Sequence, residues 1–258
     1  MTLKEKIKNG EKLIGTHVFL SNVSISKIAG LSGYDYVWID LEHGTMSIDD
    51  LLATIIAVKS GGAAVVVRVP QNDLTYTKKV MDLGVDGIIF PMIKTAEEAN
   101  EQIANTLYPP YGTRGFGPMN AVDYGFADVK EYITHPVDNT CRFIQIEHID
   151  AVNNLDEIIK NEYIDGYIFG PNDLSGSINR LCEIKIEPTL ELMRKTIKTL
   201  KAAGKCVGIS TGDLTEEGLK FWHDMDIDMI SSGGDYTFMM QGFIRNREIL
   251  EKVHKYAK

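Results

Sequence analysis

The chain has 258 residues, with 27 basic and 36 acidic side chains and a formal net charge of −9 at pH 7. Hydrophobic residues make up 44% of it and charged residues 24%, which is typical of a globular protein and excludes a disordered chain or a coiled coil. The excess of carboxylates repels phosphate groups, so nucleic acids and anionic membranes are not expected partners.

Neither secretion nor membrane insertion is expected from the sequence. No apolar run approaches the roughly 18 residues that a membrane-spanning helix needs, and the first residues, MTLKEKI, lack the apolar stretch of a signal peptide. The cysteines Cys141, Cys182 and Cys206 are scattered and odd in number, which favours a reduced compartment over a disulfide framework. We therefore expect a cytoplasmic protein.

Short apolar runs rich in valine and isoleucine alternate with amphipathic segments along the chain. Continuous runs of this kind are typical of parallel strands that are buried on both faces. The segments between them place apolar residues at helical spacing, as at Ile48, Leu51 and Ile55. Eight of the runs are predicted to be strands, at residues 16–19, 36–39, 63–67, 87–90, 142–146, 166–169, 206–209 and 228–230.

Eight strand–helix units in one uninterrupted chain predict a single α/β domain over residues 1–258, a (β/α)8 or TIM barrel. A doubly wound sheet also alternates strand and helix, but the count of eight strands favours the barrel. The connections at 91–141 and 170–205 are long, and each is expected to hold a main helix plus an excursion of the kind that often forms a lid. A helix at 3–9 is expected to close the bottom of the barrel, and 236–257 is predicted to be a long final helix.

Polar side chains follow four of the predicted strands at their carboxyl ends, the face on which barrel enzymes build their active sites. A single carboxylate at a strand end is often only a helix cap or a surface group, but four strands converge on one rim here, and we therefore predict a site there. His148 is expected to point away from the rim because side chains alternate along a strand. The residues that follow the four strands are Asp40, Glu42 and His43, then Arg68, then Glu147 and His148, then Asn172 and Asp173.

The residue types at this rim fit a divalent metal ion and a carbonyl substrate. Glu147 and Asp173 are oxygen ligands on neighbouring strands, which Mg²⁺ or Mn²⁺ prefers, and two carboxylates leave coordination positions for water and a chelating substrate. Arg68 could neutralise an oxyanion, and His43 could move a proton near neutral pH. Backbone N–H groups after Gly170 could bind a substrate carboxylate. Together they predict that a bond is made or broken next to a carbonyl through a metal-held enolate.

Five segments occur in an order and at a spacing that match a known family: WIDLEHG at 38–44, RVP at 68–70, YPPYGTRG at 108–115, QIE at 145–147 and GPNDLS at 170–175. They resemble the HpcH/HpaI aldolases, metal-dependent (class II) pyruvate aldolases that include 4-hydroxy-2-oxoheptanedioate aldolase and 2-keto-3-deoxy sugar-acid aldolases. The resemblance implies reversible cleavage of a 4-hydroxy-2-oxo acid to pyruvate and an aldehyde. It also implies a divalent metal cofactor, Mg²⁺ first, with Mn²⁺ or Co²⁺ as alternatives.

The resemblance assigns catalytic roles to three residues. His43 matches the family's histidine base, which acts through a water molecule. Asp82 matches the carboxylate that raises the basicity of that histidine, although by itself it reads as an ordinary residue late in a helix. Arg68 matches the arginine that stabilises the enolate and the carbonyl group being cleaved.

The resemblance also assigns binding roles. Glu147 and Asp173 match the metal ligands, and Asp173 lies beside the substrate as well. Gln145 and Asn172 match residues that contact the pyruvate moiety; the family commonly has alanine in place of Asn172, so the backbone N–H is expected to make that contact. Barrels of this phosphoenolpyruvate/pyruvate type commonly exchange the last helix between subunits and form hexamers. A homo-oligomer, either a hexamer or a smaller symmetric assembly, is therefore implied.

One departure from the family pattern lies on the first predicted strand. The family often has a tryptophan that lines the site there, whereas this chain has His17. A histidine is smaller, forms hydrogen bonds and titrates, so His17 is either a rim histidine without a role or part of a changed pocket. The natural substrate therefore cannot be transferred from a relative.

Other functions fit the sequence less well. GISTG at 208–212 has the pattern of a hydrolase nucleophile elbow, but too little chain follows Ser210 for the acid, the histidine and the remaining sheet of an α/β-hydrolase. A Schiff-base aldolase needs a lysine inside the barrel, and Lys94 is the nearest candidate. An acyl-CoA lyase for malyl- or citramalyl-CoA, or a citrate lyase subunit, is the main alternative, and it predicts a basic groove that this acidic chain does not obviously supply. A non-catalytic binding subunit is disfavoured because all of the family's chemical positions are filled.

Overall fold

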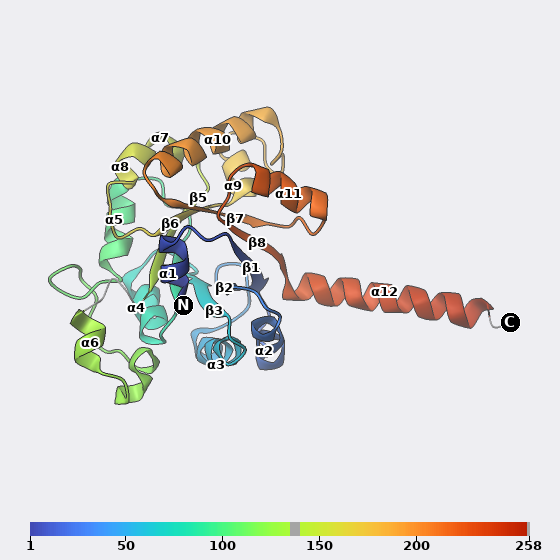
Figure 1. Cartoon of the computed structure of the whole chain (residues 1–258), viewed down its shortest axis with the longest axis horizontal. Helices are drawn as coiled ribbons and strands as arrows, with labels where there is room; N and C mark the ends of the chain where they lie inside the picture. The colour runs from blue at the N-terminus through green and yellow to red at the C-terminus, as the bar shows by residue number, and fades with distance from the viewer. Residues whose placement is uncertain (135–139, 257–258) are drawn as a thin grey trace.

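The structure, a computed structural model, describes residues 1–134 and 140–256. Its centre is a closed barrel of parallel strands in which each strand pairs with the next along the chain and the last pairs with the first (Figure 1). The predicted barrel is confirmed, and a doubly wound sheet is excluded because this sheet has no open edge. The strands are β1 (Leu13–Val18), β2 (Tyr36–Asp40), β3 (Ala64–Arg68), β4 (Gly87–Phe90), β5 (Cys141–Ile146), β6 (Gly166–Phe169), β7 (Cys206–Thr211) and β8 (Met229–Gly234).

Strand ends depart from the predicted apolar runs where backbone pairing continues into polar residues. β4 and β6 coincide with their runs, whereas β2 and β3 end one residue later, because Asp40 pairs with Arg68 in the ladder. β1 begins earlier than its run because Leu13 pairs with Met229 of β8. The polar side chains predicted to follow the strands therefore lie partly on the strands themselves, where the backbone holds them rigidly.

Helices surround the barrel on the outside, and several begin at a side-chain cap, as α3 does at Ser47 with a full capping box. The two long connections hold the expected excursions: η1 and α6 follow α5, and α9 precedes α10. Residues 135–139 of the first connection lie outside the described residues. The helices are α1 (Leu3–Lys8), α2 (Val23–Leu31), α3 (Ile48–Lys59), α4 (Leu74–Asp82), α5 (Ala96–Ala104), η1 (Asn120–Gly125), α6 (Val129–Thr134), α7 (Ile149–Asn153), α8 (Leu155–Ile158), α9 (Pro171–Gly176), α10 (Glu187–Ala202), α11 (Glu216–Asp224) and α12 (Asp235–Tyr256).

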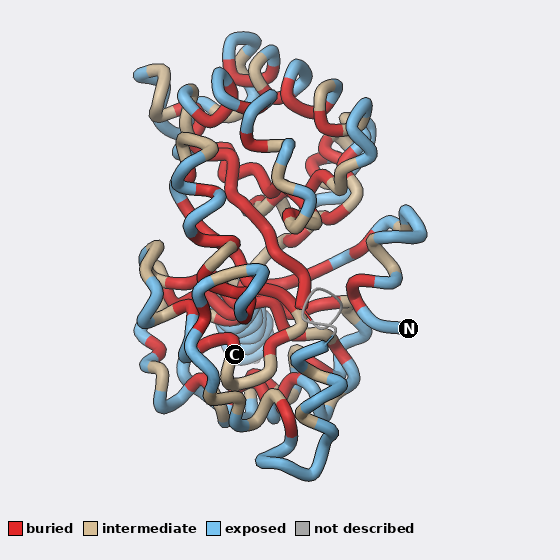
Figure 2. The backbone as a smooth tube through the Cα atoms, turned by 90° about the vertical axis from the view of Figure 1, so that its left-hand side faces the viewer, coloured by how far each residue is buried: buried red, intermediate tan, exposed pale blue. Residues whose placement is uncertain are grey.

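Buried residues form two apolar layers, one inside the barrel and one between the strands and the helices. Figure 2 shows burial concentrated along the strands, with exposed residues on the outer turns of the helices. Leu3 of α1 belongs to the inner layer, so α1 closes the bottom of the barrel as predicted. The inner layer consists of Leu3, Leu13, Tyr36, Trp38, Val66, Ile89, Cys141, Phe143, Ile168 and Met229.

Four aspartates repeat one arrangement at the bottom of the barrel. Each directly precedes an even-numbered strand, accepts a hydrogen bond from a backbone N–H of the preceding strand and forms an ion pair with a lysine. The arrangement ties the strands together in pairs at their amino ends, which leaves the polar residues at the opposite rim free for chemistry. The sets are Asp35 with Ile14 and Lys6, Asp86 with Val65 and Lys59, Asp165 with Arg142 and Lys4, and Asp228 with Val207 and Lys201.

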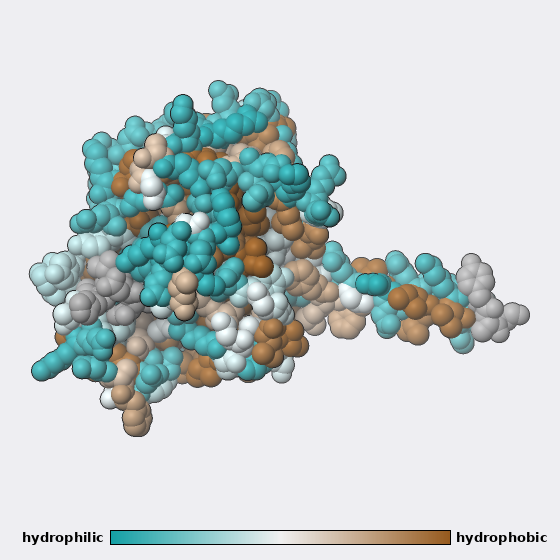
Figure 3. All heavy atoms as spheres, in the orientation of Figure 1, coloured by the Kyte–Doolittle hydropathy of each residue, from teal (hydrophilic) through white to brown (hydrophobic). Residues whose placement is uncertain are grey.

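The last helix, α12, leaves β8 and points away from the barrel (Figure 1). Many of its apolar side chains are exposed, including those of Phe243, Ile249, Leu250 and Val253. Figure 3 shows hydrophobic side chains, in brown, along the projecting helix. The helix was predicted to reach residue 257, which lies outside the described residues. Among the described helices, none combines the length and the hydrophobicity that crossing a membrane requires.

Candidate functional site

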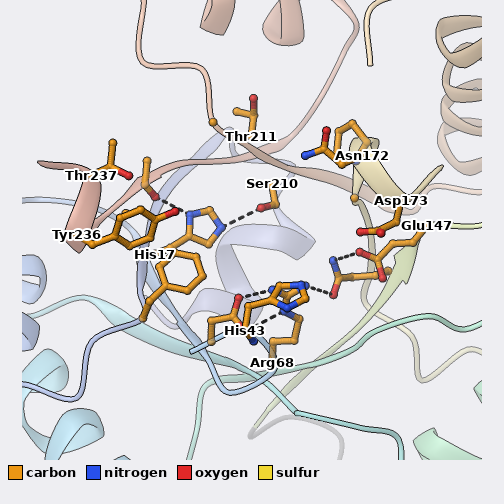
Figure 4. Close-up of a pocket in the computed structure, with 18 residues that line it drawn as sticks. His17, His43, Arg68, Glu147, Asn172, Asp173, Ser210, Thr211, Tyr236 and Thr237 are labelled. Carbon is orange, nitrogen blue, oxygen red and sulfur yellow. Dashed lines mark hydrogen bonds and ion pairs between the residues drawn. The ribbon is translucent and has the colours of Figure 1, made fainter. Parts of the chain in front are cut away.

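The carboxyl ends of the strands surround a cavity of about 320 Å³ (Figure 4). Six of the seven site residues predicted from the sequence line it, and Asp82 does not. His17 lines it as well, from β1. The six predicted residues are His43, Arg68, Gln145, Glu147, Asn172 and Asp173.

Two carboxylates lie together on one side of this cavity. Glu147 follows β5 and is buried; its Oε1 accepts a hydrogen bond from Gln145 Nε2 at 2.8 Å, and its Oε2 accepts one from the backbone N–H of Met92 at 3.0 Å. Asp173, in the first turn of α9, points toward the same part of the cavity (Figure 4). Burial raises the pKa of Glu147 to about 7; the hydrogen bond from Met92 and the charge of Arg68 oppose this rise, and the charges of Glu42 and Asp173 add to it.

This pair of carboxylates has the chemistry of a divalent-cation site. The hydrogen-bond donors to Glu147 are an amide and a backbone N–H, which carry no charge to balance the buried carboxylate. Carboxylate oxygens are hard ligands of the kind that Mg²⁺ and Mn²⁺ prefer. In the described part of the chain no three His, Cys, Asp or Glu side chains gather to hold a metal ion. Glu147 and Asp173 would therefore hold it together with water and substrate oxygens.

Arg68 ends β3, and its buried guanidinium is held on several sides. It pairs with Asp40 through Nη2 and through Nε, the latter at 3.3 Å from Oδ1, and its Nη1 lies 2.7 Å from Glu42 Oε2. Nη1 also donates to Gln145 Oε1 at 3.3 Å, and the guanidinium carbon lies 5.3 Å from the centre of the Trp38 ring. The positive charge is therefore preorganised at the cavity and linked through Gln145 to the carboxylate of Glu147.

Asp40 and Glu42, which the sequence places at the rim without assigning them a role, both pair with Arg68 in the structure. Asp40 is fully buried and lines the cavity. Burial raises the pKa of Glu42, while Arg68 opposes that rise. The signal that could have found Asp40 is alternation along β2: Trp38 belongs to the inner layer, so the residue two positions later faces the same side. Glu42 lies beyond the end of the strand, and alternation does not place it.

His43 and Asp82, predicted to act as a pair, have different partners within one chain. The His43 side chain is 64% exposed, and its Nε2 lies 3.9 Å from Glu42 Oε2. Asp82, at the end of α4, accepts a hydrogen bond from Arg114 Nη2 at 2.5 Å. Burial raises the pKa of Asp82, and Arg114 acts in the opposite direction. The expected contact between Asp82 and His43 is thus not made within a single chain.

His17 makes two specific hydrogen bonds at the far side of the cavity. Its Nδ1 lies 2.7 Å from the carbonyl oxygen of Gly233, and its Nε2 lies 3.0 Å from Ser210 Oγ. A carbonyl oxygen only accepts, so Nδ1 carries the proton and Nε2 accepts one from the serine hydroxyl. Burial lowers the pKa of His17 to about 4, so the ring is neutral at physiological pH.

The residues on which the disfavoured functions depend are not positioned for catalysis. Lys94 does not line the cavity, and among the described residues no lysine does, so a Schiff-base mechanism lacks its nucleophile. Ser210 belongs to β7 of a closed barrel, which excludes an α/β-hydrolase fold. His148 does not line the cavity either, and its Nδ1 accepts a hydrogen bond from the Asp150 backbone N–H at 3.1 Å and so caps α7, in agreement with a structural role.

Comparisons with known proteins agree with this geometry. Residues 13–218 match the family model of the HpcH/HpaI aldolase/citrate lyase family. The 2-keto-3-deoxy-L-rhamnonate aldolase of Escherichia coli strain K12 is 34% identical over 205 residues, which cover 80% of this chain and 77% of that protein.

Two solved structures resemble the whole barrel. The HpcH/HpaI aldolase from Desulfitobacterium hafniense DCB-2 superposes with a TM-score of 0.89 at 26% identity, covering 97% of both chains. An HpcH/HpaI aldolase/citrate lyase family protein from Burkholderia cenocepacia J2315 also has a TM-score of 0.89, at 25% identity over 98% of both chains. The chain therefore belongs to the HpcH/HpaI aldolase/citrate lyase family, and it is a carbon–carbon lyase of the aldolase type.

Proposed function

We propose that the protein is a metal-dependent pyruvate aldolase that cleaves a 4-hydroxy-2-oxo acid reversibly to pyruvate and an aldehyde. The observation that carries this proposal is the buried carboxylate of Glu147, which lies beside Asp173 and, among the described residues, is hydrogen-bonded to the uncharged donors of Gln145 and Met92. A divalent ion held there, Mg²⁺ first and Mn²⁺ or Co²⁺ as alternatives, supplies Lewis-acid chemistry to a 2-oxo acid.

Gln145 and the first turn of α9 position this reaction. The Gln145 amide donates to Glu147 and accepts from Arg68, so one side chain sets the distance between the carboxylate and the guanidinium. Asn172 and Asp173 line the cavity at the start of α9, where the backbone N–H of Asn172 binds the substrate carboxylate.

Arg68 and His43 carry out the charge stabilisation and the proton transfer. The guanidinium of Arg68 stabilises the negative charge that develops on the keto oxygen when the C3–C4 bond breaks, and it needs no rearrangement because Asp40 and Glu42 already hold it. The exposed ring of His43 takes the proton of the C4 hydroxyl through a water molecule. Asp82 assists His43 only where a second subunit brings the two residues together, since within one chain Asp82 is paired with Arg114.

The charges of the cavity favour an aldolase over the acyl-CoA or citrate lyase alternative. Arg68 is the one arginine or lysine among the described residues that line the cavity, and it is already paired with Asp40 and Glu42. The phosphates of coenzyme A would therefore find no cationic partner there. The cavity volume also suits a small acid better than a nucleotide-bearing thioester.

A homo-oligomer is part of the proposal because α12 cannot bury its apolar side chains against its own barrel. An isolated helix that exposes a row of large hydrophobic residues needs a partner surface. A second copy of the chain, in a hexamer or a smaller symmetric assembly with exchanged last helices, would provide it. The cytoplasmic location expected from the scattered cysteines completes the proposal.

Pyruvate release from 4-hydroxy-2-oxo acids tests the proposal directly. With added Mg²⁺, Mn²⁺ or Co²⁺ the protein is expected to release pyruvate, and Glu147→Gln and Asp173→Asn are each expected to abolish this release while the barrel stays folded. In metal-free buffer Glu147→Gln is expected to raise the melting temperature, because the variant removes a buried unpaired charge. Undiminished turnover after exhaustive chelation, or turnover only of malyl- or citramalyl-CoA, would overturn the proposal.

A further inference from the structure

The wall of the cavity that runs from Asp173 across to His17 and the start of α12 is lined by hydroxyl groups. Ser210 and Thr211 come from β7, and Tyr236 and Thr237 come from the start of α12 (Figure 4). The neutral ring of His17 lies among them. This wall therefore offers hydrogen bonds without charge to the part of a substrate that extends away from the two carboxylates.

The neighbours of Ser210 determine whether its hydroxyl donates or accepts a hydrogen bond toward the cavity. Because Gly233 takes the proton of His17 Nδ1, the free lone pair of Nε2 accepts the hydrogen of Ser210 Oγ at 3.0 Å. The Ser210 hydroxyl therefore donates its proton to the histidine, and its oxygen lone pairs are left to accept a hydrogen bond from a group in the cavity. Ser210 is thus an acceptor that matches a donor group such as a substrate hydroxyl.

His17 is held rigidly, so the direction of this hydrogen bond does not change with a rotation of the ring. The ring packs against Phe19 and Trp38, with centroids 5.7 and 5.1 Å away. Asp235 accepts hydrogen bonds from the backbone N–H groups of Phe19 and Leu20, which ties the loop after β1 to the start of α12. A depressed pKa also makes His17 a poor base for activating Ser210 as a nucleophile.

Charge at this wall limits the substrate further. Among the described residues that line the cavity, the one arginine or lysine is Arg68, which is engaged by Asp40 and Glu42. A second carboxylate or a phosphate on the distal part of the substrate would therefore lie there without a compensating cation. Such a group is disfavoured because it loses hydration that the neutral hydroxyl groups only partly replace.

We infer that His17 and Ser210 select an uncharged, hydroxylated aldehyde, with Ser210 Oγ accepting a hydrogen bond from a substrate hydroxyl and His17 positioning the serine. The inference rests on the proposed function and deepens it by naming the class of aldehyde. It predicts a 2-oxo-3-deoxy acid that carries hydroxyls beyond C4 in preference to one that ends in an alkyl chain or a second carboxylate.

Matched aldehydes, condensed with pyruvate in the presence of Mg²⁺, test the selection in the wild-type protein. Glyceraldehyde is compared with propanal, which has the same carbon skeleton, and glycolaldehyde with methoxyacetaldehyde, which keeps the oxygen but lacks the donor. The hydroxylated member of each pair is expected to have a kcat/KM at least about tenfold higher. Succinic semialdehyde, which carries the distal carboxylate, is expected to be a poorer acceptor than glyceraldehyde. Equal or reversed ratios would overturn the inference.

Variants test whether the preference for hydroxylated aldehydes depends on His17 and Ser210. Ser210→Ala is expected to reduce the glyceraldehyde-to-propanal ratio toward one, mainly through the KM for glyceraldehyde, whereas Ser210→Thr keeps the hydroxyl and is expected to restore it. His17→Phe leaves the serine proton uncommitted and is expected to weaken the preference for glycolaldehyde over methoxyacetaldehyde. Ser60→Ala, at the exposed end of α3, is the matched control. Circular dichroism checks folding, and a Ser210→Ala protein that is folded and retains the wild-type ratio would overturn the inference.

A separate measurement distinguishes this failure from a failure of the proposed function. Exchange of the pyruvate methyl protons in D₂O, followed by NMR with added Mg²⁺, reports on enolate formation without any aldehyde. If the methyl protons exchange but the hydroxylated and unsubstituted aldehydes react equally well, only the selective role of His17 and Ser210 is rejected, and the aldolase proposal stands. Absence of both exchange and condensation would reject the aldolase and the selection that depends on it.

Discussion

A methyl group built on Gly170 would lie 2.1 Å from Glu147 Oε1. Gly170 follows β6 and caps α9, which carries Asp173, and Glu147 follows the neighbouring β5. The missing side chain lets one carboxylate pass directly over the backbone that presents the other. This close approach brings together the two carboxylates that we propose to share one ion.

Gly170→Ala is expected to displace the Glu147 carboxylate and to weaken Mn²⁺ binding at least about tenfold. The added methyl group meets Glu147 side-chain atoms at 2.1 to 2.9 Å, so the carboxylate must turn away from Asp173. Isothermal titration calorimetry measures the affinity. Gly242→Ala on α12, where a methyl group has nothing within 4 Å, is the control. Wild-type affinity in Gly170→Ala would show that the two carboxylates do not share an ion.

Arg68→Lys is expected to lower kcat by about 10²- to 10³-fold with a smaller change in KM. A lysine keeps the charge but cannot contact Asp40, Glu42 and Gln145 together, so the charge loses its fixed position. Steady-state kinetics of pyruvate release measures both constants, and a thermal melt verifies the fold. Near-normal kcat in a folded Arg68→Lys protein would mean that a mobile charge suffices.

The protein is expected to lose stability as the pH falls from about 6.5 to about 4, in part because of His17. The folded-state pKa of His17 is lowered from 6.5 to about 4, so in this range the unfolded chain binds a proton that the folded chain does not. Burial is the main cause of the shift, Arg68 acts in the same direction, and Asp40, Asp235 and the Gly233 carbonyl oppose it. The contribution is on the order of 3 kcal/mol at most.

Urea unfolding at pH 7 and pH 4.5 checks this contribution. His17→Phe is expected to lose less stability between the two pH values than the wild-type protein does, whatever its absolute stability. His223→Phe, on the exposed part of α11, is the control for a histidine outside the cavity. The same pH dependence in His17→Phe and in the wild-type protein would contradict the buried, neutral histidine.

Phe243→Glu on α12 is expected to convert the oligomer into smaller species. Phe243 is 70% exposed in the single chain, and a carboxylate at this position would be costly to bury against a second copy. Light scattering measures the molar mass. Gln241→Glu, an exposed position on the same helix, adds the same charge without removing an apolar contact and is expected to leave the mass unchanged. A monomeric wild-type protein would refute the proposed assembly.

The sequence alone was sufficient to predict the barrel fold and the polar residues at the carboxyl-end rim of the barrel. Eight continuous apolar runs predict strands buried on both faces, and parallel strands joined by helices bring their carboxyl ends to one face. That reasoning is local, because it needs only the pattern within each run and the residue type that follows it. It was enough to place His43, Arg68, Glu147, Asn172 and Asp173 around a common cavity.

Only the tertiary structure decided which of these residues touch each other and which further residues join them. The pairing of Arg68 with Asp40 of β2 and with Glu42 just after it, and the contact of His17 on β1 with Ser210 on β7, depend on barrel closure and on which face of each strand turns inward. The same holds for Asp82, whose partner within the chain is Arg114 and not His43. Residues far apart in the sequence approach one another only through packing of the whole barrel, and no local pattern records that geometry.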